Sequence, residues 1–586
     1  MYCIVEFVVE NGRPPTGAYD AMNKLKGILL IVLLIAIIGI PRLVGLGKFT
    51  SIDEPFWLHQ SANFYYALGQ RQFENTIYEY HPAVTTMWII SLGMLAYFPE
   101  YRALGQGYLK QGKFELFMAS HGKDPLQLLI VSRTLQVVII ILLLLIVYYL
   151  LKRMFDDRSA FFTTALISVS PFFLGQSRLL NHEALLGLFL LISLLGLLVY
   201  LYVERKMLLL LLSSCAGALG QLTKSSGIPL VPIIFLVLLV YAITTNRNRL
   251  GQGLLEAGRT SGIWLIALAF FYILFWPGMW VAPGKMLYEV YGNAFSYTFQ
   301  GMRLSVLPGL ETAGFKVDTL RTGLEIYFTD LIWRTTVVSW LGGVAGLWMA
   351  VVFITRKTGQ NYLFTFFYSA ILALAFILLF SIQQGPKPPH YILTSYISLD
   401  LIAGLGFAHA LEFLADHVPK INRGWGIWAS LGIILMIQLI SAAGFYPYYI
   451  TYNNPVTKAL LPQSQNPTVK ETGYGVGLDQ AADYLSNKVG AGEMTVLSAN
   501  GYGSFSYYFP GKTTPMNDLD LSDPVIVGIL KGSQYAVVDY YNQKRIGLLT
   551  GFKDVKPEKI IWINGIEYLH IYRAADLLAT IGISPP

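Results

Sequence analysis

Long apolar runs separated by short polar turns make up most of the chain from residue 27 to residue 445. A membrane-spanning helix needs about 20 mostly apolar residues. Runs near this length occur at 27–46, 130–151, 159–176, 184–203, 207–223, 227–243, 261–280, 335–355, 363–381, 390–411 and 426–445. The pattern predicts a polytopic α-helical membrane protein with about 11 transmembrane helices.

Basic residues between the runs set the expected orientation, because short loops rich in Lys and Arg stay in the cytoplasm. With the N-terminus inside and the ambiguous run at 82–98 not spanning, all of the basic clusters are cytoplasmic: Lys152-Arg153, Arg205-Lys206, Arg247 with Arg249, Arg356-Lys357, and Lys420 with Arg423. We therefore predict a multi-pass plasma-membrane protein. The run at 82–98 is then an interfacial or re-entrant helix in a first outer loop, 47–129, and a second long outer loop covers 281–334.

The pattern changes at both ends of this region. Residues 1–26 read as a cytoplasmic tail, with Met1 or Met22 as the start. Residues 446–586 read as a soluble extracytoplasmic α/β domain. Its signals are helical spacing at 477–485, strand-like runs at 495–498 and 535–538, and a hairpin over 559–572 with Asn564-Gly565 as the turn.

Composition agrees with a membrane protein. The chain is 54% hydrophobic and 13% charged, with a mean hydropathy of +0.52, whereas soluble domains carry about 25% charged residues. The net charge of +7 resides in short loops, so we expect membrane lipids and no nucleic acid as partners. Cys3 and Cys215 lie in the tail and in an apolar run, and we predict no disulfide between them.

An acidic pair, Asp53-Glu54, follows the outer end of the first apolar run. Carboxylates at a membrane edge are costly to bury and suited to proton transfer. The same pair could instead cap the helix that begins near Phe56, because acidic residues favour helix N-termini. The sequence leaves both interpretations open.

Other charged and polar residues fall on the same outer side: Glu79, His81, Arg178, Glu183, Lys224, Lys387 and His390. Each has an ordinary explanation, such as an interfacial anchor, an ion pair or a helix start. Lys224, in Thr223-Lys224-Ser225-Ser226-Gly227, suits a phosphate near the membrane surface. Glu79 and His81 could hold a divalent metal ion, although two residues are weak evidence for such a site.

The order of these motifs resembles that of the membrane glycosyltransferases of the C-type (GT-C) fold. An acidic pair is followed by His81-Pro82, an Arg-x-x-x-x-acid step at Arg178 and Glu183, a Thr-Lys step at Lys224, and a Pro-rich loop that leads to His390-Tyr391. The nearest branches are the protein O-mannosyltransferases (family 39) and the lipid A aminoarabinose transferases. The resemblance covers about residues 27–411.

The resemblance implies roles for individual residues. Asp53 matches the catalytic base, and Glu54 matches the acid beside it. Glu183 stands where Asp is more usual in the substrate-binding second outer loop, and Lys224, with Arg178, would contact the donor phosphate. His390-Tyr391 replaces a more usual Arg-Tyr, which removes a permanent positive charge that Lys387 could supply. His81-Pro82 resembles the mannosyltransferase branch, and His81 and Tyr391 would contact substrate.

The expected function is an inverting glycosyltransferase. It would move a sugar from a polyprenyl-phosphate-linked donor to an acceptor hydroxyl on a protein, lipid or glycan outside the cytoplasm. The main alternative is a transporter or flippase for a lipid-linked glycan, and a third is a non-catalytic scaffold. Transporters place charges near the bilayer midplane, whereas Val137–Leu151 and Leu185–Leu201 carry none.

Overall fold

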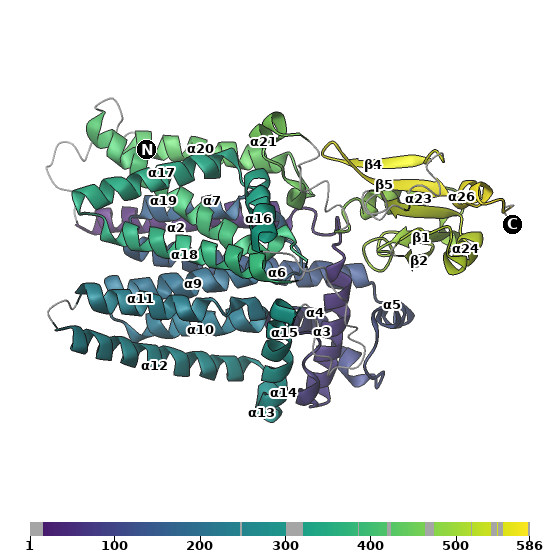
Figure 1. Cartoon of the computed structure of the whole chain (residues 1–586), viewed down its shortest axis with the longest axis horizontal. Helices are drawn as coiled ribbons and strands as arrows, with labels where there is room; N and C mark the ends of the chain where they lie inside the picture. Colours follow the sequence, from purple (N-terminus) through teal and green to yellow (C-terminus); the bar gives the residue numbers. More distant parts are fainter. Residues whose placement is uncertain are drawn as a thin grey trace.

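A helical bundle and a smaller α/β domain at one end of it make up the computed structural model of the chain (Figure 1). The structure describes residues 16–245, 249–300, 320–384, 386–418, 424–462, 474–516, 518–540, 548 and 555–583. Parts of the predicted basic clusters at 247 and at 420–423, and the predicted outer loop at 301–319, lie outside the described residues.

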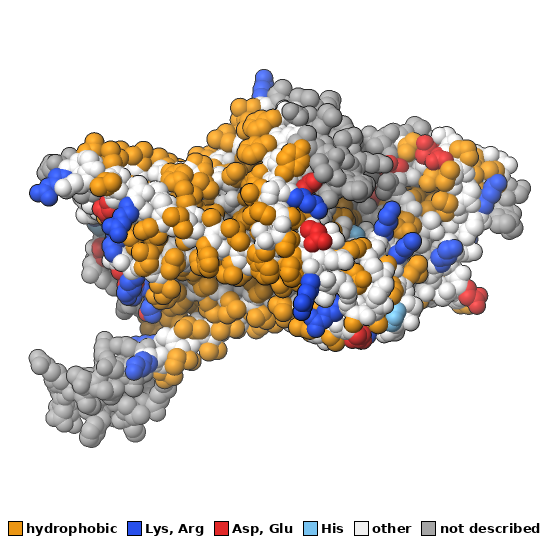
Figure 2. All heavy atoms as spheres, turned by 90° about the horizontal axis from the view of Figure 1, so that it is seen from below, with side chains coloured by type: hydrophobic (Ala, Val, Ile, Leu, Met, Phe, Trp, Pro, Cys, Tyr) orange, Lys and Arg blue, Asp and Glu red, His pale blue; other side chains and the backbone are white. Residues whose placement is uncertain are grey.

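Within these ranges, nine helices are long and apolar enough to span a membrane. They are α2 (Thr16–Leu43), α6 (Pro125–Met154), α9 (Glu183–Tyr202), α11 (Leu230–Thr245) together with the turns from Ser225 that lead into it, α12 (Leu250–Phe275), α17 (Val337–Arg356), α18 (Gln360–Ile382), α19 (Leu393–His417) and α20 (Trp425–Ala443). Hydrophobic side chains cover the body of the bundle, and charged side chains gather toward its ends (Figure 2). The predicted membrane class is confirmed.

Two of the predicted spans are shorter than expected. The run at 159–176 is divided into α7 (Asp157–Ser168) and α8 (Pro171–Gln176), because Pro171 cannot continue the preceding helix. The run at 207–223 forms α10 (Met207–Thr223), whose 17 residues rise about 25 Å, short of a bilayer core of about 30 Å.

Short helices lie across the end of the bundle that carries the α/β domain (Figure 1). They are α3 (Asp53–Gly69), α4 (Val84–Tyr97), α5 (Gln111–Ser120), α13 (Gly278–Val281), α14 (Pro283–Leu287), α15 (Asn293–Gln300) and α16 (Leu320–Arg334). The 14 residues of α4 are too few for a full crossing, which agrees with the prediction for 82–98. The described residues of both predicted outer loops are therefore largely helical.

The C-terminal domain is a five-stranded sheet with helices. The strands are β1 (Thr495–Ala499), β2 (Lys512–Met516), β3 (Tyr535–Asp539), β4 (Lys559–Ile563) and β5 (Ile566–Arg573), in the order β2-β1-β3-β5-β4. The helices are α23 (Leu478–Ser486), α24 (Pro524–Lys531) and α26 (Ala574–Thr580). β1 is parallel to β2 and β3, and β5 is antiparallel to β3 and β4.

The predicted local elements of this domain are confirmed. Asn564 and Gly565 join β4 to β5 with φ of 52° and 79°, as a two-residue hairpin turn with positive φ at both positions requires. The helix predicted at 477–485 is α23, and the two predicted strands are β1 and β3.

Tyrosines join the C-terminal domain to the bundle. The Tyr508 and Thr50 hydroxyls lie 2.7 Å apart, and the Tyr507 hydroxyl donates to Glu115 of α5 at 3.3 Å. Phe49, from the loop before α3, packs within the apolar core of this domain. The domain is thereby fixed against the loop that carries the acidic pair.

Candidate active site

Asp53 is the first residue of α3, directly after the loop that follows the first membrane helix, α2. Its Oδ2 accepts a hydrogen bond from the Tyr474 hydroxyl at 2.9 Å. Burial raises the pKa of Asp53 to about 6. The Tyr474 hydrogen bond and Lys224 oppose this rise, and Glu183 and Glu54 add to it. These groups therefore lie close enough to one another to interact.

Lys224 and Glu183 form a buried ion pair whose two charges both act on Asp53. Lys224 immediately follows α10 and Glu183 begins α9, so two neighbouring helices bring them to the same end of the bundle. Lys224 Nζ lies 2.6 Å from Glu183 Oε1 and 3.9 Å from the centroid of the Tyr391 ring. The ammonium group thus faces both an anion and an aromatic face, each of which favours a cation.

Two histidines complete the surroundings of the pair. The His390 ring packs 5.4 Å from the Tyr474 ring. His182, directly before Glu183, shares a hydrogen bond with Thr86 at 2.9 Å. Burial lowers the pKa of His182 to about 4, so this side chain is neutral at pH 7.

Glu54 is held differently from Asp53. Arg133 of α6 binds both of its carboxylate oxygens, at 2.7 and 2.6 Å. The Leu180 N–H donates to Oε1 at 2.9 Å, and the Ser51 N–H donates to Oε2 at 2.8 Å. The Glu54 side chain has no solvent exposure. A carboxylate with this many donors holds its surroundings together, which leaves Asp53 as the candidate base of the pair.

Glu54→Gln tests this division of roles. We expect the free energy of unfolding to fall by roughly 1–3 kcal/mol, because the amide nitrogen would leave a buried Arg133 donor unsatisfied. Thermal unfolding of the purified protein in detergent measures the loss. A variant of unchanged stability with greatly reduced sugar transfer would instead show that Glu54 acts in the chemistry.

Arg178 and Lys387 lie at the expected end of the bundle, but their hydrogen bonds go to backbone carbonyls. Arg178 donates to the carbonyls of Pro41, Val44 and Gly45, just where α2 ends. Lys387 donates to the carbonyls of Phe380 and Ser381 in the last turn of α18 and to that of Gln383, the residue after it. Through these bonds both cations stabilise helix ends.

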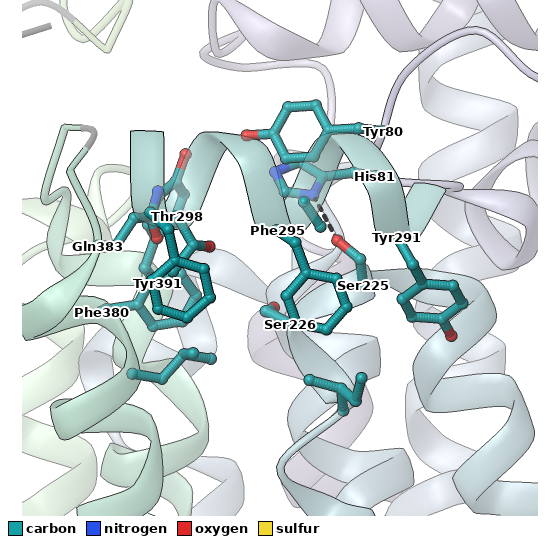
Figure 3. Close-up of a pocket in the computed structure, with 14 residues that line it drawn as sticks. Tyr80, His81, Ser225, Ser226, Tyr291, Phe295, Thr298, Phe380, Gln383 and Tyr391 are labelled. Atoms are coloured by element: carbon teal, nitrogen blue, oxygen red, sulfur yellow. Dashed lines mark hydrogen bonds between the residues drawn. The ribbon is translucent and has the colours of Figure 1, made fainter. Parts of the chain in front are cut away.

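A pocket opens beside Tyr391 and Ser225, the residue after Lys224 (Figure 3). His81 lies at its rim, with Nδ1 3.4 Å from the Ser225 hydroxyl. Apolar and aromatic side chains make up most of the remaining lining: Tyr80, Ile228, Tyr291, Ala294, Phe295, Phe299, Leu379 and Phe380. Phe295 and Phe299 are both exposed, so part of the lining faces out of the protein.

No metal site is assembled where the sequence suggested one. Among the residues that the structure describes, no three His, Cys, Asp or Glu side chains come together as ligands. Glu79 Oε1 accepts the Tyr80 N–H at 3.0 Å, and His81 faces Ser225. Glu79 and His81 therefore form no three-ligand group with any other His, Cys, Asp or Glu side chain that the structure describes.

Sequence reasoning missed three residues at or near this site: Tyr474, Arg133 and Arg334. Arg334 ends α16, which packs against the turn that carries His390. It is buried, lies 3.5 Å from Asp330 and donates to the Ile450 carbonyl at 2.9 Å. An additional cation therefore lies near the position where His390 replaces the more usual Arg.

Residues 116–280 match the family model of dolichyl-phosphate-mannose-protein mannosyltransferases. This match supports the resemblance to the C-type glycosyltransferases over the region that contains Arg178, Glu183 and Lys224. Asp53 precedes the matched region. A search of curated protein sequences finds no match.

Solved structures of similar architecture include ArnT and an oligosaccharyltransferase. ArnT from Cupriavidus metallidurans bound to undecaprenyl phosphate has 13% identity and a TM-score of 0.44, with 93% of this chain and 97% of that chain covered. The Archaeoglobus fulgidus oligosaccharyltransferase has 11% identity and a TM-score of 0.43, with 87% and 69% covered. Similarity at this level does not assign a role to any residue of this chain.

Proposed function

We propose that this protein is an inverting glycosyltransferase that moves a sugar from a polyprenyl-phosphate donor to an acceptor hydroxyl. One observation carries the proposal: Asp53, whose pKa burial raises to about 6, is within electrostatic range of the buried Lys224–Glu183 pair, and Lys224 contacts Tyr391, which lines a largely apolar pocket. A base, a cation and an apolar surface are what a lipid-phosphate donor and a hydroxyl acceptor require. The family match at 116–280 supports the same class of reaction.

The proposed reaction is a single displacement. The acceptor oxygen attacks the anomeric carbon while Asp53 takes the hydroxyl proton. The bond between the anomeric carbon and the phosphate oxygen breaks, and polyprenyl phosphate leaves with the electron pair. Lys224 offsets the negative charge that grows on this oxygen, an interaction that is strongest in the transition state. Attack from the face opposite the phosphate inverts the anomeric centre.

The pocket beside Tyr391 is the proposed entrance for the donor. Its exposed Phe295 and Phe299 lie near the ends of the membrane helices α11 and α18, where a polyprenyl chain would run in the bilayer. The phosphate would then meet Lys224, whose ammonium faces the Tyr391 ring that lines the pocket. In this pose the sugar lies between the phosphate and Asp53.

We place this end of the bundle outside the cytoplasm. Lys152-Arg153 end α6, Arg205-Lys206 follow α9, and Arg356 ends α17, at the ends of these helices remote from Asp53. The rule that short basic loops stay inside assigns these loops to the cytoplasm. The C-terminal domain and the acceptor then share the outer side.

The pH dependence of transfer tests the base. Asp53 can accept a proton only when ionised, and its raised pKa is about 6. We therefore expect kcat/KM to be constant above this pH and to fall about tenfold per pH unit below it, as for one essential base. Initial rates between pH 4.5 and 8.5 at fixed ionic strength measure this. A profile still flat at pH 5 would exclude a base with this pKa.

A second function, transport of a lipid-linked glycan, is favoured by one residue. Asp400 lies inside α19 and accepts a hydrogen bond from Ser339 of α17 at 2.5 Å. Buried acidic residues within membrane helices are common in transporters. Asp400 lies within α19, ten residues after His390, so this function would depend on a different carboxylate from Asp53.

A further inference from the structure

We propose that Tyr474 is a positioning residue for Asp53, so that the active site is complete only when the C-terminal domain is docked on the bundle. The inference rests on the proposed role of Asp53 as the base. It assigns a part in the reaction to a domain whose sequence carries no catalytic motif.

The contact between the two residues is direct. The Tyr474 hydroxyl donates to Asp53 Oδ2 at 2.9 Å across 421 positions of sequence. Among the residues that the structure describes, Tyr474 is the one side chain that donates a hydrogen bond to the Asp53 carboxylate. The Tyr474 ring also packs 5.4 Å from the His390 ring and against the apolar core of the C-terminal domain. Tyr474 therefore connects this domain with both sides of the site.

The backbone after Tyr474 is fitted closely to the loop that precedes Asp53. Gly475 has a φ of +86°, and a Cβ at this position would lie 2.7 Å from the Thr50 carbonyl oxygen. Only glycine fits such an approach with positive φ. The Thr50 hydroxyl in turn lies 2.7 Å from the Tyr508 hydroxyl. Two contacts thus fix the position from which Tyr474 reaches the base.

The hydrogen bond has a chemical consequence for Asp53. A donor to a carboxylate favours its ionised form, and Tyr474 accordingly lowers the pKa of Asp53 against the effect of burial. Of the other charged neighbours, Lys224 also lowers this pKa, and Glu183 and Glu54 raise it. Burial and Asp53 raise the pKa of the Tyr474 phenol well above its ordinary value, so it remains a donor at neutral pH. With Oδ2 occupied, Oδ1 is the oxygen for the acceptor proton.

Carbodiimide labelling of the full-length protein tests the inference without relying on sugar transfer. Dicyclohexylcarbodiimide adds to protonated carboxyl groups and leaves a stable N-acylurea, which peptide fragmentation can locate on Asp53 rather than Glu54. In the wild type we expect half-maximal labelling near pH 6, the pKa of Asp53. In Tyr474→Phe we expect this midpoint to rise by roughly one pH unit, since the ionised form loses a charge-assisted hydrogen bond.

Tyr508→Phe is the matched control. It removes a hydroxyl from the same domain interface, 2.7 Å from Thr50 rather than from a carboxylate. We expect its labelling midpoint to equal that of the wild type. An unchanged midpoint in Tyr474→Phe, or an equal rise in both variants, would overturn the assignment. An equal rise in both variants would show that the labelling midpoint depends on contact between the two domains as a whole and not on the Tyr474 hydroxyl.

The pH profile of transfer then separates this inference from the proposed function. If the proposed function and the role of Tyr474 are both correct, the acid limb of the kcat/KM profile moves to higher pH in Tyr474→Phe. The shift equals that of the labelling midpoint. The decrease in kcat/KM relative to the wild type is therefore larger at pH 6 than at pH 8. A labelling midpoint that shifts in a protein without transfer activity would leave Tyr474 as the partner of Asp53 and would refute the proposed function.

Discussion

Replacement of Asp53 by Asn is expected to lower kcat/KM for sugar transfer by roughly 10²–10⁴-fold, the usual contribution of a general base. The amide has nearly the shape of the carboxylate, and its oxygen can still accept the Tyr474 hydrogen bond seen at 2.9 Å. It cannot take a proton from the acceptor hydroxyl. Initial rates with labelled donor, at equal abundance of both proteins, measure the loss.

Two further measurements serve as controls for the activity of Asp53→Asn. The thermal unfolding temperature of Asp53→Asn should not fall below that of the wild type. Burial of the Asp53 charge is unfavourable, as its raised pKa indicates, and the amide carries no charge. Asp53→Glu keeps a base but moves it by one methylene, and we expect partial activity. Wild-type rates in Asp53→Asn would remove this residue from the mechanism.

Replacement of Lys224 by Met is expected to lower kcat by roughly 10²–10³-fold, the effect of removing one group that stabilises charge in a transition state. Methionine fills similar space against the Tyr391 ring but offers no charge to the departing phosphate. It also leaves Glu183 buried without the partner that now lies 2.6 Å away. Lys224→Met should therefore unfold more easily as well, and both rate and unfolding temperature are measured.

The double variant Lys224→Met with Glu183→Gln separates the two effects. Removing both charges of a buried pair costs much less stability than removing one, so we expect the unfolding temperature to recover while the rate stays low. Lys387→Met, another buried lysine at this end, offers a comparison because its ammonium group binds the carbonyls at the end of α18. Recovery of transfer in the double variant would show that Lys224 acts only through folding.

The sequence was most informative where local pattern decides structure. Apolar runs near 20 residues predicted the membrane helices, and Asn564-Gly565 predicted the β4–β5 hairpin. Asp53, Glu183 and Lys224 were predicted to lie together, because each is adjacent to the same end of an apolar run. The break before Pro171 was missed, since the apolar run continues on both sides of it.

The direction of side chains was harder to predict. Arg178 and Lys387 are at the expected end, but the carbonyl groups of nearby helix ends bind them. Lys387 comes five residues after the end of α18. Its binding to the last carbonyls of that helix could have been predicted, because basic residues near a helix C-terminus often do so. Tyr474 belongs to no motif and meets Asp53 only through the docking of a separate domain, so no local pattern could indicate it.

The most direct test of the central claim follows the bond between sugar and phosphate. Purified protein in liposomes is given polyprenyl-phosphate sugars labelled in the sugar, together with candidate acceptors. We expect free polyprenyl phosphate and a labelled product of inverted anomeric configuration, both lost in Asp53→Asn. Labelled donor that crosses the bilayer with its sugar–phosphate bond intact, at equal rates in both proteins, would contradict the account and identify a transporter.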